Sequence, residues 1–515
     1  MKKVKPLYIN ILLAILTVII INLVFYFGFL RIDLTANRIY SLSKPSKKLV
    51  SKFDDKILIR AVFSKVLPEQ FKFVRMYVED ILKEYRTYSR GKIKFEFIDP
   101  QQPKAKLSEN DVISMGIYPI EFTVLEKDKF EVKKGYMGIA MLYRDRKEVI
   151  PVINNIETLE YDITTALKRL TIKERKAIGI VNNHRCNTLD SEELSSFKLQ
   201  ISKLYDFKPL QISSDTLKNV EGLLIVSPKE NFDNKELFWL DQYILSGKPV
   251  AFLLDRYDVS LQNFWAMKIN SNIFDFISHY GIEILDGLVA DYQCQKVSLR
   301  TQQGFFVITN IVDYPFIPVI TKFNNTHPLV KDLSRVDLPF VSALSVKSGL
   351  QGVSYTILME TSKYSFLKKD VYTVNPLSVD FTMSKDAQKG PFIVGLELKG
   401  KFKSYFADED KFKNLQLNIS DRLTEAKQDA RILIISTSKF VDRETGLLGN
   451  IIDYIAQESD LLAIRSKDVT PPPLKAVSQT VKLLYRYFIM FVPAIIVVLA
   501  GLYRWYYRKN LVVPV

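Results

Sequence analysis

The chain has 515 residues, of which 47% are hydrophobic and 25% are charged, and its formal net charge is +15. The positive charge is spread without a dense basic run, so it favours a basic surface near anionic lipid headgroups over a nucleic-acid partner. Two cysteines, Cys186 and Cys294, exclude a disulfide framework, although a single bridge between them stays open.

The first apolar segment, residues 7–30, is long enough to cross a bilayer, which requires about 20 helical residues. A cleavable signal would have an apolar run of only about 7 to 15 residues before its cleavage site. We therefore predict a retained membrane helix, with an untypical, uncleaved signal peptide as the alternative. Asn10 and Asn22 are candidate intramembrane partner contacts, because amides in membrane helices tend to hydrogen-bond to other helices. Simple tolerance near the membrane edges is the alternative for both.

A second apolar segment, residues 487–503, is predicted to be the other membrane helix. It contains Pro493 and Gly501, which membrane helices tolerate. A buried soluble helix is the alternative. Aromatic and basic residues follow at once, a mixture typical of an interfacial anchor.

Orientation depends on the two short tails, because long loops cross the membrane largely regardless of their charge. Each tail has three cations and no acidic residue; the flanking cations are Lys2, Lys3, Lys5, Arg504, Arg508 and Lys509. Both termini are therefore predicted to be cytoplasmic and the large domain to lie outside. Cations just after the first segment argue the other way: Arg31, Arg38, Lys44, Lys47 and Lys48.

Residues 31–172 have a mixed α/β pattern. A buried strand is predicted at 56–63, a strand at 93–98 and further strands between 121 and 153, with a helix from about 157 to 170. The helix after the first strand has apolar residues at helical spacing, which predicts its core face: Phe71, Val74, Val78, Ile81, Leu82 and Tyr85. This order resembles a thioredoxin-like fold. Redox chemistry does not follow, since thiol exchange requires a thiolate pair and no cysteine precedes Cys186.

Residues 173–470 alternate short apolar runs with amphipathic helices, which predicts a parallel sheet covered by helices on both faces. Two helices begin with a capping pattern, Asp190 with Glu193 and Asp233 with Glu236. The fold class is therefore α/β, with a doubly wound domain that has a strand-rich insertion at about 258–430. A Pro-rich linker at 471–486 leads to the second membrane segment, and 504–515 form the basic tail.

Motifs for chemistry are missing from the sequence. It has neither G-x-G-x-x-G opening a helix nor G-x-x-x-x-G-K-[ST], so neither dinucleotide binding nor autonomous ATP hydrolysis is supported. His184 and Cys186 lie in a polar stretch after a strand, without a third orienting group. Asp255 and Arg256 after another strand are typical of a surface ion pair. We predict no catalytic, cofactor-binding or metal-ligating residue, and no enzyme.

Several motifs together resemble one protein family. The stretch 31–43, RIDLTANRIYSLS, resembles the D-L-T-x-x-x-x-Y-[ST]-L-S entry of auxiliary components of certain bacterial ABC transporters, in particular the gliding-motility-associated GldG family. Further matches cover nearly the whole chain: Phe97–Pro100, Gly116–Pro119, Glu148–Pro151, Leu159–Ile163, Leu167–Leu170, Asn450, Ile464–Asp468 and the Pro-rich approach to the last span.

The resemblance implies a non-catalytic subunit of the bacterial inner membrane that works with a separate permease and a separate ATPase in a complex linked to gliding motility. It also implies a periplasmic domain whose doubly wound part resembles class I glutamine amidotransferase-like domains, and it implies no cofactor. A homodimer would suit a two-fold symmetric transporter. The substrate and the direction of transport are left open.

Two rival interpretations come from other classes of protein. A membrane-anchored glycan- or peptide-binding protein acting without a transporter would use aromatic residues such as Phe264, Trp265, Phe305 and Phe306. Core packing is the alternative role for these rings. A degenerate amidotransferase-like hydrolase would depend on Cys186.

Overall fold

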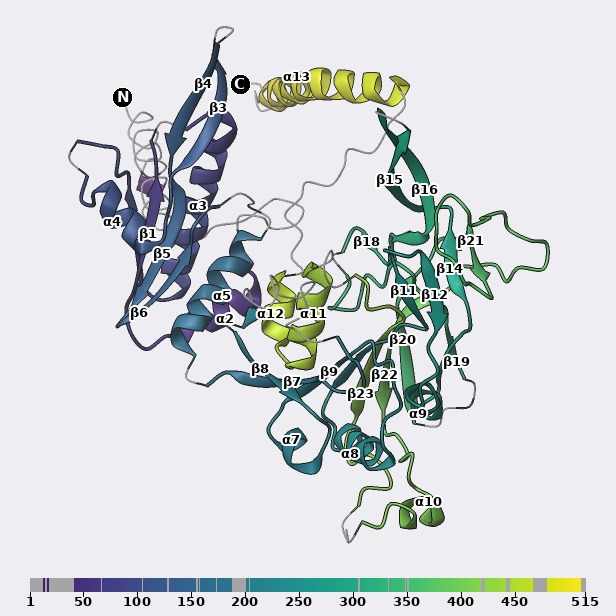
Figure 1. Cartoon of the computed structure of the whole chain (residues 1–515). Helices are drawn as coiled ribbons and strands as arrows, with labels where there is room; N and C mark the ends of the chain where they lie inside the picture. The colour runs from purple at the N-terminus through teal and green to yellow at the C-terminus, as the bar shows by residue number, and fades with distance from the viewer. Residues whose placement is uncertain are drawn as a thin grey trace, which may run out of the picture. The chain divides into compact units, whose positions relative to one another are not determined.

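A computed structural model of the chain (Figure 1) describes Leu13, Leu16, Thr17 and most of residues 41–510. Outside the described residues lie 1–12, 14–15, 18–40, 66, 104, 127–128, 154–155, 157, 173, 188–200, 203, 304–305, 332, 348, 350–351, 418–421, 441–444, 466–478 and 511–515. The chain divides into two compact units, Met1–Asp468 and Val469–Val515.

The first part of the large unit is a four-stranded mixed sheet with the strand order β2-β1-β5-β6. β1 (Ile57–Phe63) is parallel to β2 (Ile93–Ile98) and antiparallel to β5 (Met137–Tyr143), which pairs with β6 (Arg146–Ile150). The parallel pair requires a crossover, and α3 provides it. The other elements here are α2 (Lys44–Ser51), α3 (Glu69–Tyr88), α4 (Glu109–Met115), the hairpin β3 (Ile120–Glu126) and β4 (Lys129–Gly135), and α5 (Leu159–Thr171).

The predicted core face of α3 is confirmed. Val78, Ile81, Leu82 and Tyr85 are buried, whereas Phe71 and Val74 in its first turns are half-buried. Apolar residues three and four apart lie on one side of a helix, so this face packs inward while the opposite side stays solvated.

The second part is built on a ten-stranded mixed sheet. Five of its strands are parallel neighbours in the order β8-β7-β9-β10-β23. Their bounds are β7 (Lys176–Val181), β8 (Tyr205–Leu210), β9 (Gly222–Val226), β10 (Val250–Leu253) and β23 (Ala430–Ile435). The helices here are α7 (Ser214–Lys218), α8 (Asn234–Leu245), α9 (Ile273–His279), α10 (Glu409–Lys413), α11 (Thr445–Ile455) and α12 (Ser459–Arg465).

Alternate residues of the parallel strands enter two different cores, as the two-residue period of a strand requires. Leu224 and Leu253 pack with α11 and α12 on one face. Leu223 and Phe252 pack with α7, α8 and α9 on the other. The sheet is therefore covered by helices on both faces, which explains why its central strands β9 and β10 are wholly apolar.

The range predicted to be strand-rich forms the antiparallel side of this sheet and several small sheets. The strands are β11 (Tyr257–Ser260), β12 (Trp265–Lys268), β13 (Ile282–Ile284), β14 (Leu288–Asp291), β15 (Cys294–Gln303), β16 (Phe306–Ile320), β17 (Lys322–Phe323), β18 (Val336–Asp337), β19 (Leu344–Val346), β20 (Val353–Glu360), β21 (Ser365–Lys368) and β22 (Ile393–Gly400). β22 pairs antiparallel with β23 and so joins the two sides.

The small unit contains one long helix, α13 (Gln479–Asn510). Within it, Arg486–Tyr506 is long and apolar enough to cross a membrane, with a mean hydropathy of 2.0, and none of its residues with described burial is buried in the protein. The helix includes the predicted span 487–503, and it begins within the stretch predicted as linker. The first predicted span lies outside the described residues apart from three: Leu13, Leu16 and Thr17 are helical, and the Thr17 hydroxyl donates to the Leu13 carbonyl at 2.8 Å.

Gly222 at the start of β9 allows α11 to approach the sheet closely. A Cβ atom at Gly222 would lie 2.4 Å from the carbonyl oxygen of Ile455. We expect Gly222→Ala to lower the free energy of unfolding by about 1 to 3 kcal/mol through overpacking, measured by thermal denaturation of the full chain. Gly446→Ala in α11 is the matched control, because a Cβ there meets nothing within 4 Å. Equal melting temperatures for the two variants would contradict this close packing.

Candidate functional site

The first turn of α2 is fixed by a buried carboxylate. Ser43 caps α2, and both the Ser43 backbone N–H and the Ser46 hydroxyl donate to Glu160 Oε1 at 2.7 Å. Glu160 belongs to α5 and is 2% exposed. A buried carboxylate stays stable when its oxygens accept several hydrogen bonds, so α2 is tied to α5 at its first turn.

Tyr85 extends this tie to α3. Its hydroxyl lies 2.6 Å from Thr164 Oγ1 and donates to the Glu160 carbonyl oxygen at 3.1 Å. Burial, and after it the charge of Glu160, raises the pKa of Tyr85 well above its ordinary value, so the hydroxyl stays protonated. Three helices of the N-terminal part therefore share one buried polar cluster.

The end of the large unit returns to these same helices. α12 contacts both α2 and α5, and Figure 1 shows it beside them, with α11 next to α12. Glu458, between α11 and α12, accepts from the Lys168 ammonium of α5 at 2.5 Å. The two side chains are only 18% and 15% exposed. Lys48 of α2 pairs with Asp460 of α12 at 3.4 Å, with both side chains largely exposed.

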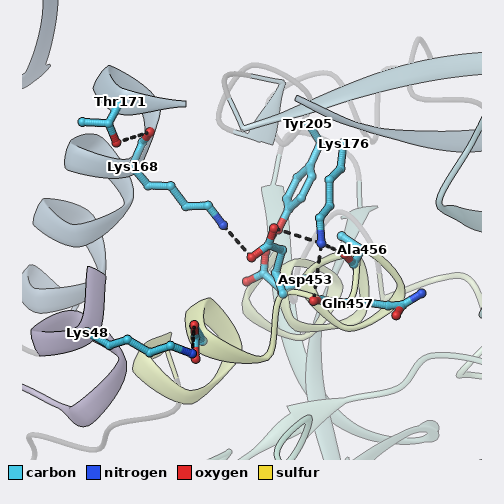
Figure 2. Close-up of polar contacts among 10 residues, drawn as sticks. Lys48, Lys168, Thr171, Lys176, Tyr205, Asp453, Ala456 and Gln457 are labelled. Atoms are coloured by element: carbon cyan, nitrogen blue, oxygen red, sulfur yellow. Dashed lines mark hydrogen bonds and ion pairs between the residues drawn. The ribbon is translucent and has the colours of Figure 1, made fainter. Parts of the chain in front are cut away.

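Lys176 at the start of β7 completes this contact from the sheet side. Its ammonium lies 2.7 Å from the Ala456 carbonyl oxygen and 3.2 Å from Glu458 Oε1 (Figure 2). A cation at a helix C-terminus satisfies free carbonyls and complements the helix dipole. The Tyr205 hydroxyl of β8 donates to Asp453 in α11 at 2.7 Å, and burial, followed by the Asp453 charge, raises the pKa of Tyr205.

We call this assembly of α2, α5, the C-terminal end of α11 and α12 the junction. α2 follows the first predicted span in the chain, and α12 is the last element before the segment that leads to α13. The junction thus brings together the described elements of the large unit that are nearest in sequence to the two predicted spans. Its hydrogen bonds and ion pairs link α2, α5 and the turn between α11 and α12.

The structure describes only some of the predicted membrane-anchor and partner-contact residues. Lys2, Lys3, Lys5, Asn10 and Asn22 lie outside the described residues. Arg504 is exposed on α13, and Arg508 and Lys509 belong to the same helix. Their roles as membrane flanks and partner contacts stay predictions.

The polar stretch after β7 is built as a structural loop. Glu236 accepts from Asn183 Nδ2 at 2.7 Å and lies 2.9 Å from His184 Nε2. The Cys186 thiol is buried, and this burial, with the nearby Glu236 charge, raises its pKa to about 12. A thiol with so high a pKa is a poor nucleophile at neutral pH. Cys186 and Cys294 are both free, and the part of the chain that the structure describes has no group of three or more metal-ligating side chains.

Asp255 differs from the surface ion pair expected at this strand end. It is 3% exposed, and its carboxylate accepts from the Ser227 hydroxyl at 2.6 Å and from the Ser438 N–H and hydroxyl at 2.6 and 2.7 Å. These bonds tie together the chain after β9, β10 and β23. The sequence gives no signal for this, because the two serines are distant from Asp255 along the chain.

Comparisons with known proteins cover most of the chain. Residues 175–457 match the family described as an ABC-type uncharacterized transport system, and residues 36–142 match a domain of unknown function, DUF7088. A Borreliella burgdorferi protein described as uncharacterized is 25% identical over 458 residues, which is 85% of each chain.

Two solved structures show weak likeness. The mmIFT52 N-terminal domain is 13% identical, with a TM-score of 0.33, and the match covers 54% of this chain and 97% of that one. A GMP synthase protein from Thermoplasma acidophilum is 10% identical, with a TM-score of 0.26 and coverages of 56% and 97%. At these scores neither likeness carries an argument.

The ion pair between Lys168 and Glu458 should couple the two parts of the large unit energetically. In a double-mutant cycle with Lys168→Gln and Glu458→Gln, we expect a coupling energy of about 1 to 2 kcal/mol, below the range for a fully buried pair because both side chains keep some exposure. Chemical denaturation of the full chain measures it. The exposed pair Lys218–Asp215, with side chains 69% and 94% exposed, is the control and should give less than about 0.5 kcal/mol. Equal coupling in the two pairs would contradict the junction's role.

Proposed function

Because the chain belongs to the family of ABC-type transport-system auxiliary proteins, with a match over more than half of its length, we propose that it couples movement of transporter partners to its large unit. The family assignment gives the transporter-associated auxiliary role. The family and the apolar helix α13 indicate association with a membrane. How the coupling works is the part that we propose.

The observation that carries the proposal is the contact of α2 with α12, the described elements of the large unit nearest in sequence to the two predicted spans. A displacement of either membrane segment relative to the other would act on α2 or on the chain after α12. Since α2 is bonded to α5 through Glu160, and α5 to the α11–α12 turn through Lys168 and Glu458, that displacement would turn the large unit as one body. Such rigid-body movement is a common form of switching transition.

The finer features of the proposal come from the sequence. We propose a GldG-type subunit with both termini in the cytoplasm, spans at 7–30 and 487–503, and the large unit in the periplasm. Its partners would be a permease and a separate ATPase, in a complex linked to gliding motility that a homodimer would suit. Residues 31–172 would be a thioredoxin-like domain without redox function, and 173–470 an amidotransferase-like domain. The link to motility rests on the resemblance alone.

We propose that the chain has no enzymatic activity of its own. The family is auxiliary, and the one thiol near a histidine at a parallel strand end, Cys186, is buried with a raised pKa. Any enzymatic reaction of the complex would then be carried out by the partner subunits.

Mass spectrometry of the tagged full-length chain, purified in mild detergent from its native cells, tests the assignment of partners. We expect stoichiometric recovery of a multi-span permease and a nucleotide-binding subunit. Recovery of the chain alone, or with envelope enzymes only, would contradict the proposal and favour the binding protein that acts without a transporter.

The amides of the first predicted span offer a second test. Replacing Asn10 and Asn22 together by leucine should reduce recovery of the permease severalfold, because each lost interhelical hydrogen bond contributes about 1 kcal/mol. Thr17→Val is the control in the same segment, since the Thr17 hydroxyl already donates within its own helix. Unchanged recovery with the doubly substituted chain would show that these amides do not make the contact.

A further inference from the structure

A cavity of about 600 Å³ opens beside the large sheet, away from the junction. Its walls come from β11, β15 and β16 and from the chain that follows β9 and β23. Ligands of open α/β sheets bind outside the carboxyl ends of the parallel strands. Lys229 follows β9 and Lys439 follows β23, so the cavity reaches this edge of the sheet.

Most of the wall is apolar. Val297 and Leu299 are two residues apart on β15 and so face the same side of the β15–β16 hairpin, as does Tyr314, whose partner on β15 is Gln295. Phe340 also lines the cavity. Tyr314 and Phe340 are 3% and 5% exposed. Of the aromatic residues considered for a binding cleft, Phe264 lines this cavity and Trp265 is not part of its described lining. Phe305 and the side chain of Phe306 lie outside what the structure describes.

Two aromatic residues of the cavity wall have an uncommon backbone conformation. Phe264 and Phe340 both have a φ of +53°, which is unfavourable for bulky side chains. Hydrogen bonds hold each in place: the Phe264 carbonyl accepts from the Val374 N–H at 2.9 Å, and the Phe340 N–H donates to the Phe316 carbonyl at 2.8 Å. Strained residues of this kind gather at ligand clamps, and their fixed backbones preform the cavity.

The charges on the cavity wall do not balance. The Lys229 ammonium pairs with the Asp258 carboxylate at 2.8 Å, and both side chains are about four-fifths buried. Lys439 is half-buried, and among the described residues its ammonium makes no ion pair. The described lining therefore has two ammonium groups and one carboxylate beside its apolar residues.

We propose that this cavity binds an amphipathic monocarboxylate. The apolar chain or ring of the ligand lies between β15 and the Phe264 and Phe340 rings. The ligand carboxylate accepts from the Lys439 ammonium, and Lys229, which lines the same cavity, adds a second positive charge. A neutral ligand would leave Lys439 unpaired, and a cation would be repelled. This site makes the large unit a sensor or carrier of a small molecule in addition to a mechanical element.

Isothermal titration of the full chain in lipid nanodiscs, with ω-phenylhexanoate as the probe, tests the proposal. Heat from empty nanodiscs is subtracted, and ω-phenylhexanamide is the neutral comparison. We expect saturable binding of the carboxylate, at least tenfold weaker binding of the amide, and a tenfold to hundredfold loss with Lys439→Gln, because a hydrogen bond to a charged group is lost. Lys385→Gln on an exposed loop is the matched charge control and should bind normally.

A second pair of variants tests the apolar wall. Leu299→Trp should fill the cavity and abolish binding, whereas Ile311→Trp on β16, at a site 68% exposed and outside the cavity lining, should leave it unchanged. Absence of saturable heat above the blank would overturn the proposal. Equal affinity for acid and amide, or normal binding by both Lys439→Gln and Leu299→Trp, would overturn it as well.

Discussion

The Glu458 carboxylate lies between two ammonium groups that belong to different parts of the large unit, Lys168 of α5 and Lys176 of β7. All three groups are partly removed from water, so each charge depends on the others for compensation. Lys176 also holds the end of α11 through the Ala456 carbonyl. One acidic side chain, in the turn between α11 and α12, therefore links the N-terminal part of the large unit to the large sheet.

Apolar packing reinforces this polar contact. Leu461 and Ile464 of α12 belong to the core cluster on one face of the large sheet, and Tyr161 of α5 packs against the same cluster. The ion pairs specify the register of α12 against α5, and the buried apolar area supplies the larger part of the stabilisation. A contact of this kind transmits displacement, because a packed interface has few arrangements of similar energy. The junction thus has the physical properties that coupling requires, while the cavity at the strand ends lies apart from it.

The sequence predicted features that depend on neighbours along the chain. The core face of α3 follows from helical spacing, and the Asp233–Glu236 capping box is confirmed with both reciprocal bonds. The alternation of short apolar runs with amphipathic helices indicated a sheet covered by helices on both faces, and Leu223 and Leu224 of β9 enter different cores, as such a sheet requires. The Asp190–Glu193 pattern, like Asn10 and Asn22, lies outside the described residues, so no structural outcome attaches to it.

The junction could not be predicted in the same way. Lys168 and Glu458 are 290 positions apart, and Lys48 and Asp460 are 412 apart. A charged residue near a helix end is ordinarily solvated, so nothing local distinguishes Glu458 from the other acidic residues of the chain. Asp255 could not be predicted either, because its serine partners follow other strands and are distant along the chain. Lys439 lies beside an apolar cavity whose walls include the β15–β16 hairpin, which is also distant along the chain.

The most direct test of the account measures whether the two parts of the large unit move as one body. Spin labels at Met76→Cys on α3 and Tyr355→Cys on β20, both exposed sites, would be placed in a full-length chain with Cys186 and Cys294 replaced by serine and reconstituted in lipid nanodiscs. Double electron–electron resonance should give one narrow distance distribution, because the junction fixes the two parts together. A broad distribution, or two separate distances, would contradict rigid coupling through Glu458.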